Sequence, residues 1–120
     1  MTLAARKAAR SIARDFGEIN QLQSSKKGTD NFIKNTNKKV QKNLIEELVK
    51  SRPEWSMLLK ENNLKKGRDE NYTWIIDPLD GKINISHGIP HFCISIAVKN
   101  QKEVIAGVIY DPLKDEMFVS

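Results

Sequence analysis

The sequence has one cysteine and no long hydrophobic run, and each absence excludes a class of protein. Because Cys93 is alone among 120 residues, no disulfide can form within the chain, which is typical of a reducing cytoplasm. The longest apolar stretch, residues 89–98, is interrupted by Pro90, His91 and Ser95 and is too short to span a bilayer. No uninterrupted apolar core follows the N-terminal arginines, so we expect no secretory signal. The expected location is cytoplasmic.

Aromatic residues are also few, at 7% of the chain, whereas the formal net charge is +5. Proteins that hold single-stranded nucleic acid interleave basic residues with aromatic rings on which bases stack, and the lysines here lack such rings. We therefore expect a solvated basic surface with weak, nonspecific, salt-dependent adhesion to nucleic acid. The lysines concerned are Lys26, Lys27, Lys34, Lys38, Lys39, Lys42, Lys60, Lys65 and Lys66.

Helical periodicity is confined to the first half of the chain. Apolar residues recur on one face over residues 3–19, where Gly17 would weaken or end the helix. The polar, turn-rich residues 20–31 predict a loop. A second helical pattern ends near Ser51, because the position before Pro53 is disfavoured in a helix. We therefore expect two N-terminal helices.

Strand patterns fill the second half of the chain. Helices followed by consecutive strands favour an α+β fold, in which the helices pack on a mainly antiparallel sheet. Nothing follows the last strand to cover it, and an exposed hydrophobic edge promotes association. We therefore expect the chain to lack a C-terminal part, and to self-associate or recruit a partner. The expected strands are residues 56–60, 72–76, 92–99, 103–110 and 115–120, with a loop over 61–71 and a turn over 111–114.

The most informative motif is a pair of acids three residues apart, after an apolar run. Asp77 and Asp80 frame a compact turn, and the carbonyl of Leu79 can point to the same place. Oxygen ligands of this kind suit Mg²⁺, and Gly81 lets the backbone approach a phosphate if a helix starts there. An Asp-Pro turn in which Asp80 caps a short helix explains the same spacing. The spacing alone leaves both interpretations open.

Three stretches resemble the inositol monophosphatase family, Mg²⁺-dependent phosphatases of small phosphate esters. WIIDPLDGKINISHGIPHFCISIAV resembles the family signature, and EVIAGVIYDPLKDEMF resembles the next hairpin. KKGTDNFIKNTNKKVQKNLIEELVKSRPEWSMLLKEN resembles the lysine-containing loop, the second helix and the strand before a Glu-Glu pair. The match is closest to bacterial members of the extragenic-suppressor type.

The resemblance covers only the N-terminal half of a full family member. It implies that residues 1–120 form a truncated domain of the sugar-phosphatase-like fold, with helices over roughly 3–50 and strands and loops over roughly 56–120. The implied reaction is hydrolysis of a small phosphate monoester such as myo-inositol 1-phosphate, with Mg²⁺ ions that activate a water and stabilise the leaving oxygen.

By position, the resemblance also implies the residues of the site. Metal ligands would be Asp77, Asp80 and, through its carbonyl, Leu79; catalytic residues would be Asp77, Asp80 and Glu61; phosphate-binding positions would be Gly81 and Lys82; and Lys27 would be a loop lysine near the metals.

Four positions depart from the family pattern. Lys60 stands in place of a metal-binding Glu, and Lys82 in place of a Thr that orients the attacking water. Two acids of the second helix appear as Asn37 and Gln41. The two aspartates of the motif bring −2 and the two lysines +2, a sum of zero. A unit charge pair at ~4 Å is worth roughly 4 kcal/mol at an effective dielectric of 20, and a lysine repels a dication about twice as strongly.

These departures lead to two predictions. The ammonium groups of Lys60 and Lys82 are expected beside Asp77 and Asp80, in place of the metals. The phosphatase is expected to be impaired or inactive in this form, and the alternative is a noncatalytic remnant that binds RNA or protein.

Overall fold

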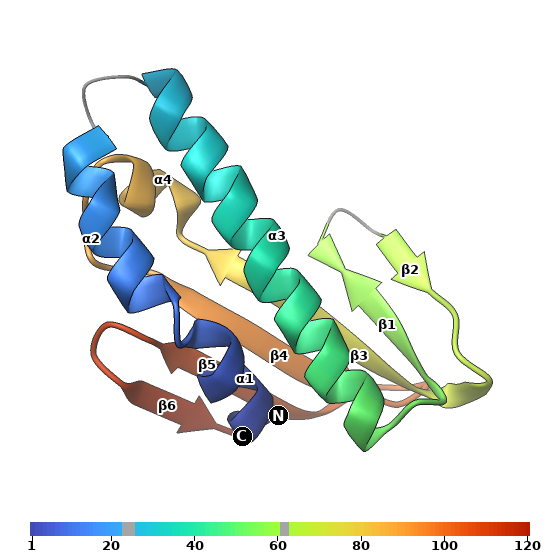
Figure 1. Cartoon of the computed structure of the whole chain (residues 1–120). Helices are drawn as coiled ribbons and strands as arrows, with labels where there is room; N and C mark the ends of the chain where they lie inside the picture. Colours follow the sequence, from blue (N-terminus) through green and yellow to red (C-terminus); the bar gives the residue numbers. More distant parts are fainter. Residues whose placement is uncertain (23–25, 61–62) are drawn as a thin grey trace.

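The computed structural model describes the backbone of residues 1–22, 26–60 and 63–120, and their side chains apart from those of 18–22, 26 and 27. Three helices come first and most of the strands follow (Figure 1). In chain order the elements are α1 (Thr2–Ala9), α2 (Ile12–Leu22), α3 (Lys26–Ser51), β1 (Trp55–Leu59), β2 (Asn63–Lys65), β3 (Asp69–Asp80), α4 (Lys82–Ser86), β4 (Cys93–Lys99), β5 (Val104–Asp111) and β6 (Glu116–Val119).

Within the described residues, the strands form one sheet in the order β2-β1-β3-β4-β5-β6. β1 and β3 are parallel, and the other neighbouring pairs are antiparallel. The parallel pair arises because β2 turns back along one side of β1, and the chain then reverses again to enter β3 on the other side. The predicted α+β fold with a mainly antiparallel sheet is confirmed.

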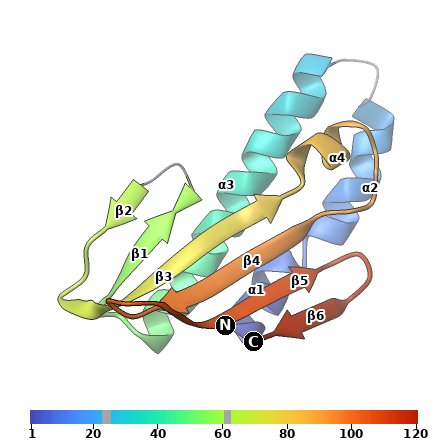
Figure 2. The ribbon, with the colours of Figure 1, turned by 180° about the vertical axis from the view of Figure 1, so that it is seen from behind.

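The helices cover one face of the sheet. In Figure 1, α1 and α3 lie in front of the strands, and from behind, in Figure 2, the sheet lies in front of the helices. The alternation of β4 fits this arrangement: Ile94, Ile96 and Val98 are buried, whereas the side chains between them are half-buried. In α1, Ala5 and Ala8 are fully buried, and their small side chains let this helix pack closely on α3.

One predicted helix is two helices in the structure. The pattern over residues 3–19 is divided by a turn at Arg10 and Ser11, because α1 packs on α3, β4 and β5 whereas α2 packs on α3 and α4. The apolar spacing continues through the turn, so periodicity alone does not reveal it. None of the described helices is long and apolar enough to cross a membrane.

The loop predicted over residues 20–31 is wrong wherever the structure describes it. Residues 20–22 end α2 and residues 26–31 begin α3, while residues 23–25 lie outside the described residues. Polar composition is typical of a solvent-exposed helix end as well as of a loop, and here it marks the former. Gly17, expected to weaken the helix, lies inside α2, and a Cβ there would meet open space.

The strands lie close to their predicted positions, with one difference that concerns the acidic motif. β3 continues past the predicted 72–76 to Asp80, so both acids of the motif belong to the strand end instead of a turn beyond it. The loop expected over 61–71 contains β2 and the start of β3; residues 61–62 lie outside the described residues.

Candidate functional site

Residues 77–81, here named the acidic strand end, begin with a bulge in β3. Asp77 is opposite Ser95 and Asp80 is opposite Cys93, so two residues of β3 face one residue of β4. Pro78 has no N–H to donate to the ladder. The carboxylate Oδ1 of Asp77 instead accepts a hydrogen bond from the Leu79 amide at 3.3 Å. The extra residue leaves Asp80 exposed.

Gly81 joins the acidic strand end to α4. Its φ of 100° and ψ of 30° are left-handed, and an added Cβ would lie 2.9 Å from the carbonyl oxygen of His91 and 3.0 Å from the Cβ of Phe92. The Asn84 side chain also holds the His91 carbonyl close to α4, because its Nδ2 donates a hydrogen bond to that oxygen at 2.8 Å. A helix, α4, starts directly after Gly81, as both interpretations of the acidic motif require. Its N-cap is Gly81, which has no side chain, so the interpretation in which Asp80 caps the helix is wrong.

Lys60 lies beside Asp77, as the sequence predicts. Its Nζ is 2.8 Å from Asp77 Oδ2. The register of the parallel strands explains the contact: Leu59 of β1 is opposite Ile76 of β3, and the next residue on each strand is Lys60 and Asp77. Their side chains are 48% and 23% exposed, so the pair lies at the surface of the sheet end.

The described side chains do not fit a Mg²⁺ ion at this strand end. Both Asp77 oxygens already accept hydrogen bonds, one from the Lys60 ammonium and one from the Leu79 amide. Since Mg²⁺ binds oxygen at about 2.0–2.1 Å, an ion on Oδ2 would lie within about 5 Å of the ammonium nitrogen. Among the residues that the structure describes, no group of three or more His, Cys, Asp and Glu side chains could hold a metal. Glu61 and the Lys27 side chain lie outside the described residues.

Lys82 is not where the sequence predicts. It was expected beside Asp80, but it lines a groove between α3 and α4 together with Asn37. Within the described part of the chain, no ion pair within 4.0 Å joins Lys82 to either aspartate. As the first residue of α4, it projects toward the helical layer and away from the sheet end. Gln41, one turn further along α3, does not line this groove.

The sequence analysis missed a further acid near Asp80. Asp111 ends β5, is 8% exposed, and accepts hydrogen bonds through Oδ1 from the amides of Leu113 and Lys114 at 3.0 and 3.1 Å. Asp80 and Asp111 line one groove of about 410 Å³. The signal was present, because Asp-Pro-Leu occurs at the end of β3 and again where β5 ends at Asp111. Two strands separated by one antiparallel neighbour end at the same edge of a sheet.

Cys93 lies between these acids at the start of β4. Burial raises the pKa of its thiol, and the carboxylates of Asp80, Asp77 and Asp111 raise it further, while Lys60 lowers it. Each of these acids disfavours the negative thiolate. The thiol pKa therefore reports the charge of the acidic strand end.

Comparison with known proteins matches the whole chain, residues 1–120, to the model of the inositol monophosphatase family. The chain belongs to this family. Inositol-1-monophosphatase of Caulobacter vibrioides is 47% identical over 119 residues, which are 98% of this chain and 46% of the relative. Nus factor SuhB of Haemophilus influenzae is 38% identical over 117 residues, covering 98% of this chain and 44% of that protein. The chain thus spans about half the length of the curated relatives it matches.

Solved structures of the inositol monophosphatase family have the same fold. The extragenic suppressor protein suhB from Bartonella henselae superposes with a TM-score of 0.86 at 39% identity, covering 100% of this chain and 45% of that protein. Inositol monophosphatase from Anabaena superposes with a TM-score of 0.71 at 29% identity. The resemblance drawn from the sequence is confirmed for the family and the fold.

Proposed function

We propose that this chain is a family member whose phosphatase activity is impaired or lost, because the Lys60 ammonium takes the place of a cation at Asp77. The observation that carries the proposal is the 2.8 Å contact between Lys60 Nζ and Asp77 Oδ2. The inositol monophosphatase family is in general Mg²⁺-dependent. An ammonium on the carboxylate opposes this requirement because it both neutralises the ligand and repels the ion.

Charge arithmetic supports the proposal. Asp77 and Asp80 contribute −2 and Lys60 contributes +1, which leaves −1 at the acidic strand end. A unit charge pair at ~4 Å is worth roughly 4 kcal/mol at an effective dielectric of 20, and a dication doubles the repulsion from Lys60. Solvent reduces this energy, since the Lys60 side chain is half-exposed.

The other family positions keep the roles that the resemblance implies, as part of this proposal. Asp80 and the Leu79 carbonyl would be the metal ligands left beside Asp77, and Glu61 the remaining member of the Glu-Glu pair. Gly81 and the Lys82 amide would bind phosphate. Gly81 places the first amides of α4 directly after the exposed Asp80, which supports the last assignment, because amides at a helix start can bind phosphate.

The test is phosphate release from inositol 1-phosphate, with and without Mg²⁺. The variants are Lys60→Glu and Lys60→Glu/Lys82→Thr, with Lys65→Glu on β2 as a control of equal charge change. We expect no Mg²⁺-dependent release from the native chain or the control, and measurable release from the double variant. Mg²⁺-dependent turnover by the native chain would refute the proposal.

The second half of the relatives is outside this chain, so activity alone is an incomplete test. If every variant is inactive, a Mg²⁺-dependent rise in melting temperature still reveals a restored metal site, because an ion that binds only the folded state stabilises it. A rise in the Lys60→Glu chain without turnover would assign the loss of activity to the half of the relatives that this chain does not span.

A noncatalytic, protein-binding function is the second candidate. It is supported by the open side of the last strands, where Ile105, Ile109 and Phe118 are 48%, 47% and 61% exposed. Exposed apolar side chains on an uncovered face of a sheet favour association with another chain. A second copy, or a chain that supplies the missing half, would cover them. Light scattering over a range of concentrations tests self-association, and a mass equal to one chain throughout would exclude it.

A cytoplasmic location belongs to the same proposal. It is supported by the single cysteine, since disulfides are rare in reducing compartments. Fractionation of cells that express the tagged chain tests it.

A further inference from the structure

The first helix, α1, is attached to the rest of the molecule by little apolar surface. Its one bulky apolar residue, Leu3, is 61% exposed. Its buried residues are all alanines, namely Ala4, Ala5, Ala8 and Ala9. Because the hydrophobic free energy scales with the apolar area that is buried, these alanines hold α1 less firmly than the buried isoleucine, valine and leucines hold α3.

The helix α1 also has little stability of its own. It has eight residues, no side-chain hydrogen bond at its N-cap and no acid in its first turn. Isolated helices shorter than about 12–15 residues are marginal in water, so α1 stays helical because it is docked on α3, β4 and β5. The turn at Arg10 and Ser11 separates it from α2, and α1 can therefore undock without unwinding α2.

A charged contact joins α1 to α3. Lys7 Nζ is 3.0 Å from Glu47 Oε2, and Lys50 of α3 lies 3.4 Å from Oε1 of the same carboxylate. The hydrogen bond from Lys7 holds the pKa of Glu47 below its ordinary value; partial burial opposes this effect and Lys50 adds to it. The carboxylate of Glu47 therefore stays charged beside α1.

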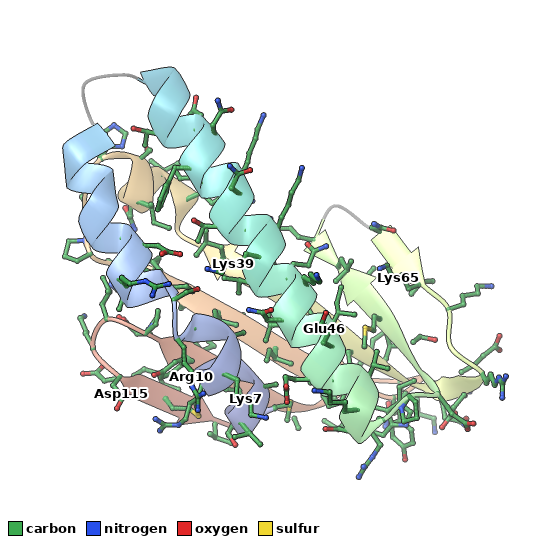
Figure 3. All side chains as sticks on the ribbon, in the orientation of Figure 1. Lys7, Arg10, Lys39, Glu46, Lys65 and Asp115 are labelled. Atoms are coloured by element: carbon green, nitrogen blue, oxygen red, sulfur yellow. The ribbon has the colours of Figure 1, made fainter. Side chains whose placement is uncertain are left out.

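A second charged contact joins α1 to the turn between β5 and β6. Arg6 Nη1 is 2.9 Å from Asp115 Oδ1, and the Tyr110 hydroxyl donates to the same oxygen at 2.7 Å. The Arg6 guanidinium also lies over the Tyr110 ring, 5.5 Å from its centroid. Lys7 on α1 and Asp115 in this turn are labelled in Figure 3. The two contacts thus fasten α1 to two separate parts of the fold.

We propose that α1 is a strap that charge holds in place, and that it opens as a unit while the rest of the chain stays folded. Segments with few buried apolar contacts are the ones that open locally in proteins. One surface ion pair is worth little, so the strap depends on both contacts. When Arg6 and Lys7 lose their partners, only the alanine face holds α1, and the surfaces of α3, β4 and β5 beneath it meet solvent.

The strap does not depend on the proposed loss of phosphatase activity. Its contacts involve Arg6, Lys7, Glu47, Tyr110 and Asp115, none of which belongs to the acidic strand end. Salt screens charges at the surface, and high ionic strength therefore opens the strap.

The test is hydrogen–deuterium exchange of the full chain, measured by mass spectrometry on peptides from α1 and α3. We expect the α1 amides to exchange faster than those of residues 40–48. Arg6→Gln or Lys7→Gln should speed exchange in α1 about two- to fivefold, as expected for one surface ion pair, and unchanged exchange in α3 shows that each variant is folded. The matched control is Arg10→Gln, because Arg10 has no carboxylate within 4.0 Å among the described residues.

A charge swap separates the specific contact from net charge. Lys7→Glu and Glu47→Lys each place like charges across the contact between α1 and α3, and both should speed exchange in α1. The double variant Lys7→Glu/Glu47→Lys restores an opposite-charge pair and should exchange more slowly in α1 than either single variant. Molar salt should speed exchange in α1 of the native chain, and should have no such effect in Arg6→Gln/Lys7→Gln.

Three results would overturn the inference. The first is exchange in α1 that is no faster than in α3, which would mean that α1 opens only when the whole chain unfolds. The second is equal acceleration by Arg10→Gln, which would assign the effect to net charge. The third is a charge-swapped chain whose α1 exchanges as fast as in the single variants.

Discussion

The acidic strand end and the groove between α3 and α4 both contain a lysine that departs from the family pattern, but the two lysines lie in different surroundings. At the strand end, Lys60 lies 2.8 Å from Asp77, and its charge offsets one of the two aspartates. In the groove between α3 and α4, Lys34, Lys38 and Lys82 have no carboxylate within 4.0 Å among the described residues. A parallel strand register holds Lys60 against an acid, whereas the start of a helix directs Lys82 away from one. The same type of residue therefore neutralises an acid in one region and has no such partner among the described residues in the other.

The largest expected effect comes from the residue that joins the two regions. Gly81→Ala should lower the free energy of unfolding by about 1–3 kcal/mol, because a non-glycine residue there is strained and its Cβ would be 2.9 Å from the His91 carbonyl oxygen. Urea denaturation measures this. The matched control is Gly17→Ala inside α2, where a Cβ meets open space and a gain of about 0.5–1 kcal/mol is expected. Equal stability of Gly81→Ala and the native chain would show that an alanine at this position is not strained.

Mg²⁺ titration tests the acidic strand end directly. In the native chain we expect millimolar Mg²⁺ to leave the melting temperature unchanged, because the Lys60 ammonium occupies Asp77 Oδ2. In Lys60→Glu we expect a rise of several degrees, since saturation at about 100 times the dissociation constant adds roughly 2.7 kcal/mol. The variant Lys82→Thr should behave like the native chain. A rise in melting temperature in Lys82→Thr but not in Lys60→Glu would mean that Lys82, and not Lys60, blocks the metal site.

Cys93 provides a chemical probe that distinguishes the two regions. Because burial and the nearby carboxylates raise the pKa of the Cys93 thiol, iodoacetamide should modify it slowly at pH 7–8. The rate should rise with pH, and the midpoint of that rise should lie above the pKa of an exposed cysteine. Asp80→Asn should increase the rate by lowering the thiol pKa. Lys82→Gln should leave the rate unchanged, since its side chain lies in the other groove. Mass spectrometry measures both rates, and an equal response to both substitutions would contradict the separation.

The smallest expected effect concerns α3. Lys38→Glu replaces two like-charge neighbours, Lys34 and Lys42, by two opposite-charge pairs four residues apart. It should stabilise the chain by about 0.5–1 kcal/mol, a gain that falls at high salt. Thermal melts at low and at molar salt measure this effect, and Lys38→Gln, with about half the gain, is the control. Destabilisation by Lys38→Glu would show that the groove lysines are compensated after all.

Local patterns in the sequence determined much of this protein. Strand alternation placed β4 and β5 nearly where they lie, because one face of each strand is buried under the helices. The contact between Lys60 and Asp77 was also predictable, through the family motif and its opposite charges. By contrast, the polar residues around the α2–α3 connection predicted a loop, since solvent-exposed helix ends and loops have similar composition.

Only the tertiary structure decided how distant positions meet. Asp111 joins Asp80 because β3 and β5 run in the same direction on either side of β4, and strand order is not written in any single strand. The division between α1 and α2 follows from the different surfaces on which they pack. Lys82 faces α3 because Gly81 adopts a left-handed conformation that sets the direction of α4. The sequence thus determined which charges the protein has, and tertiary packing decided that Lys60 pairs with Asp77 whereas Lys82 has no such partner among the described residues.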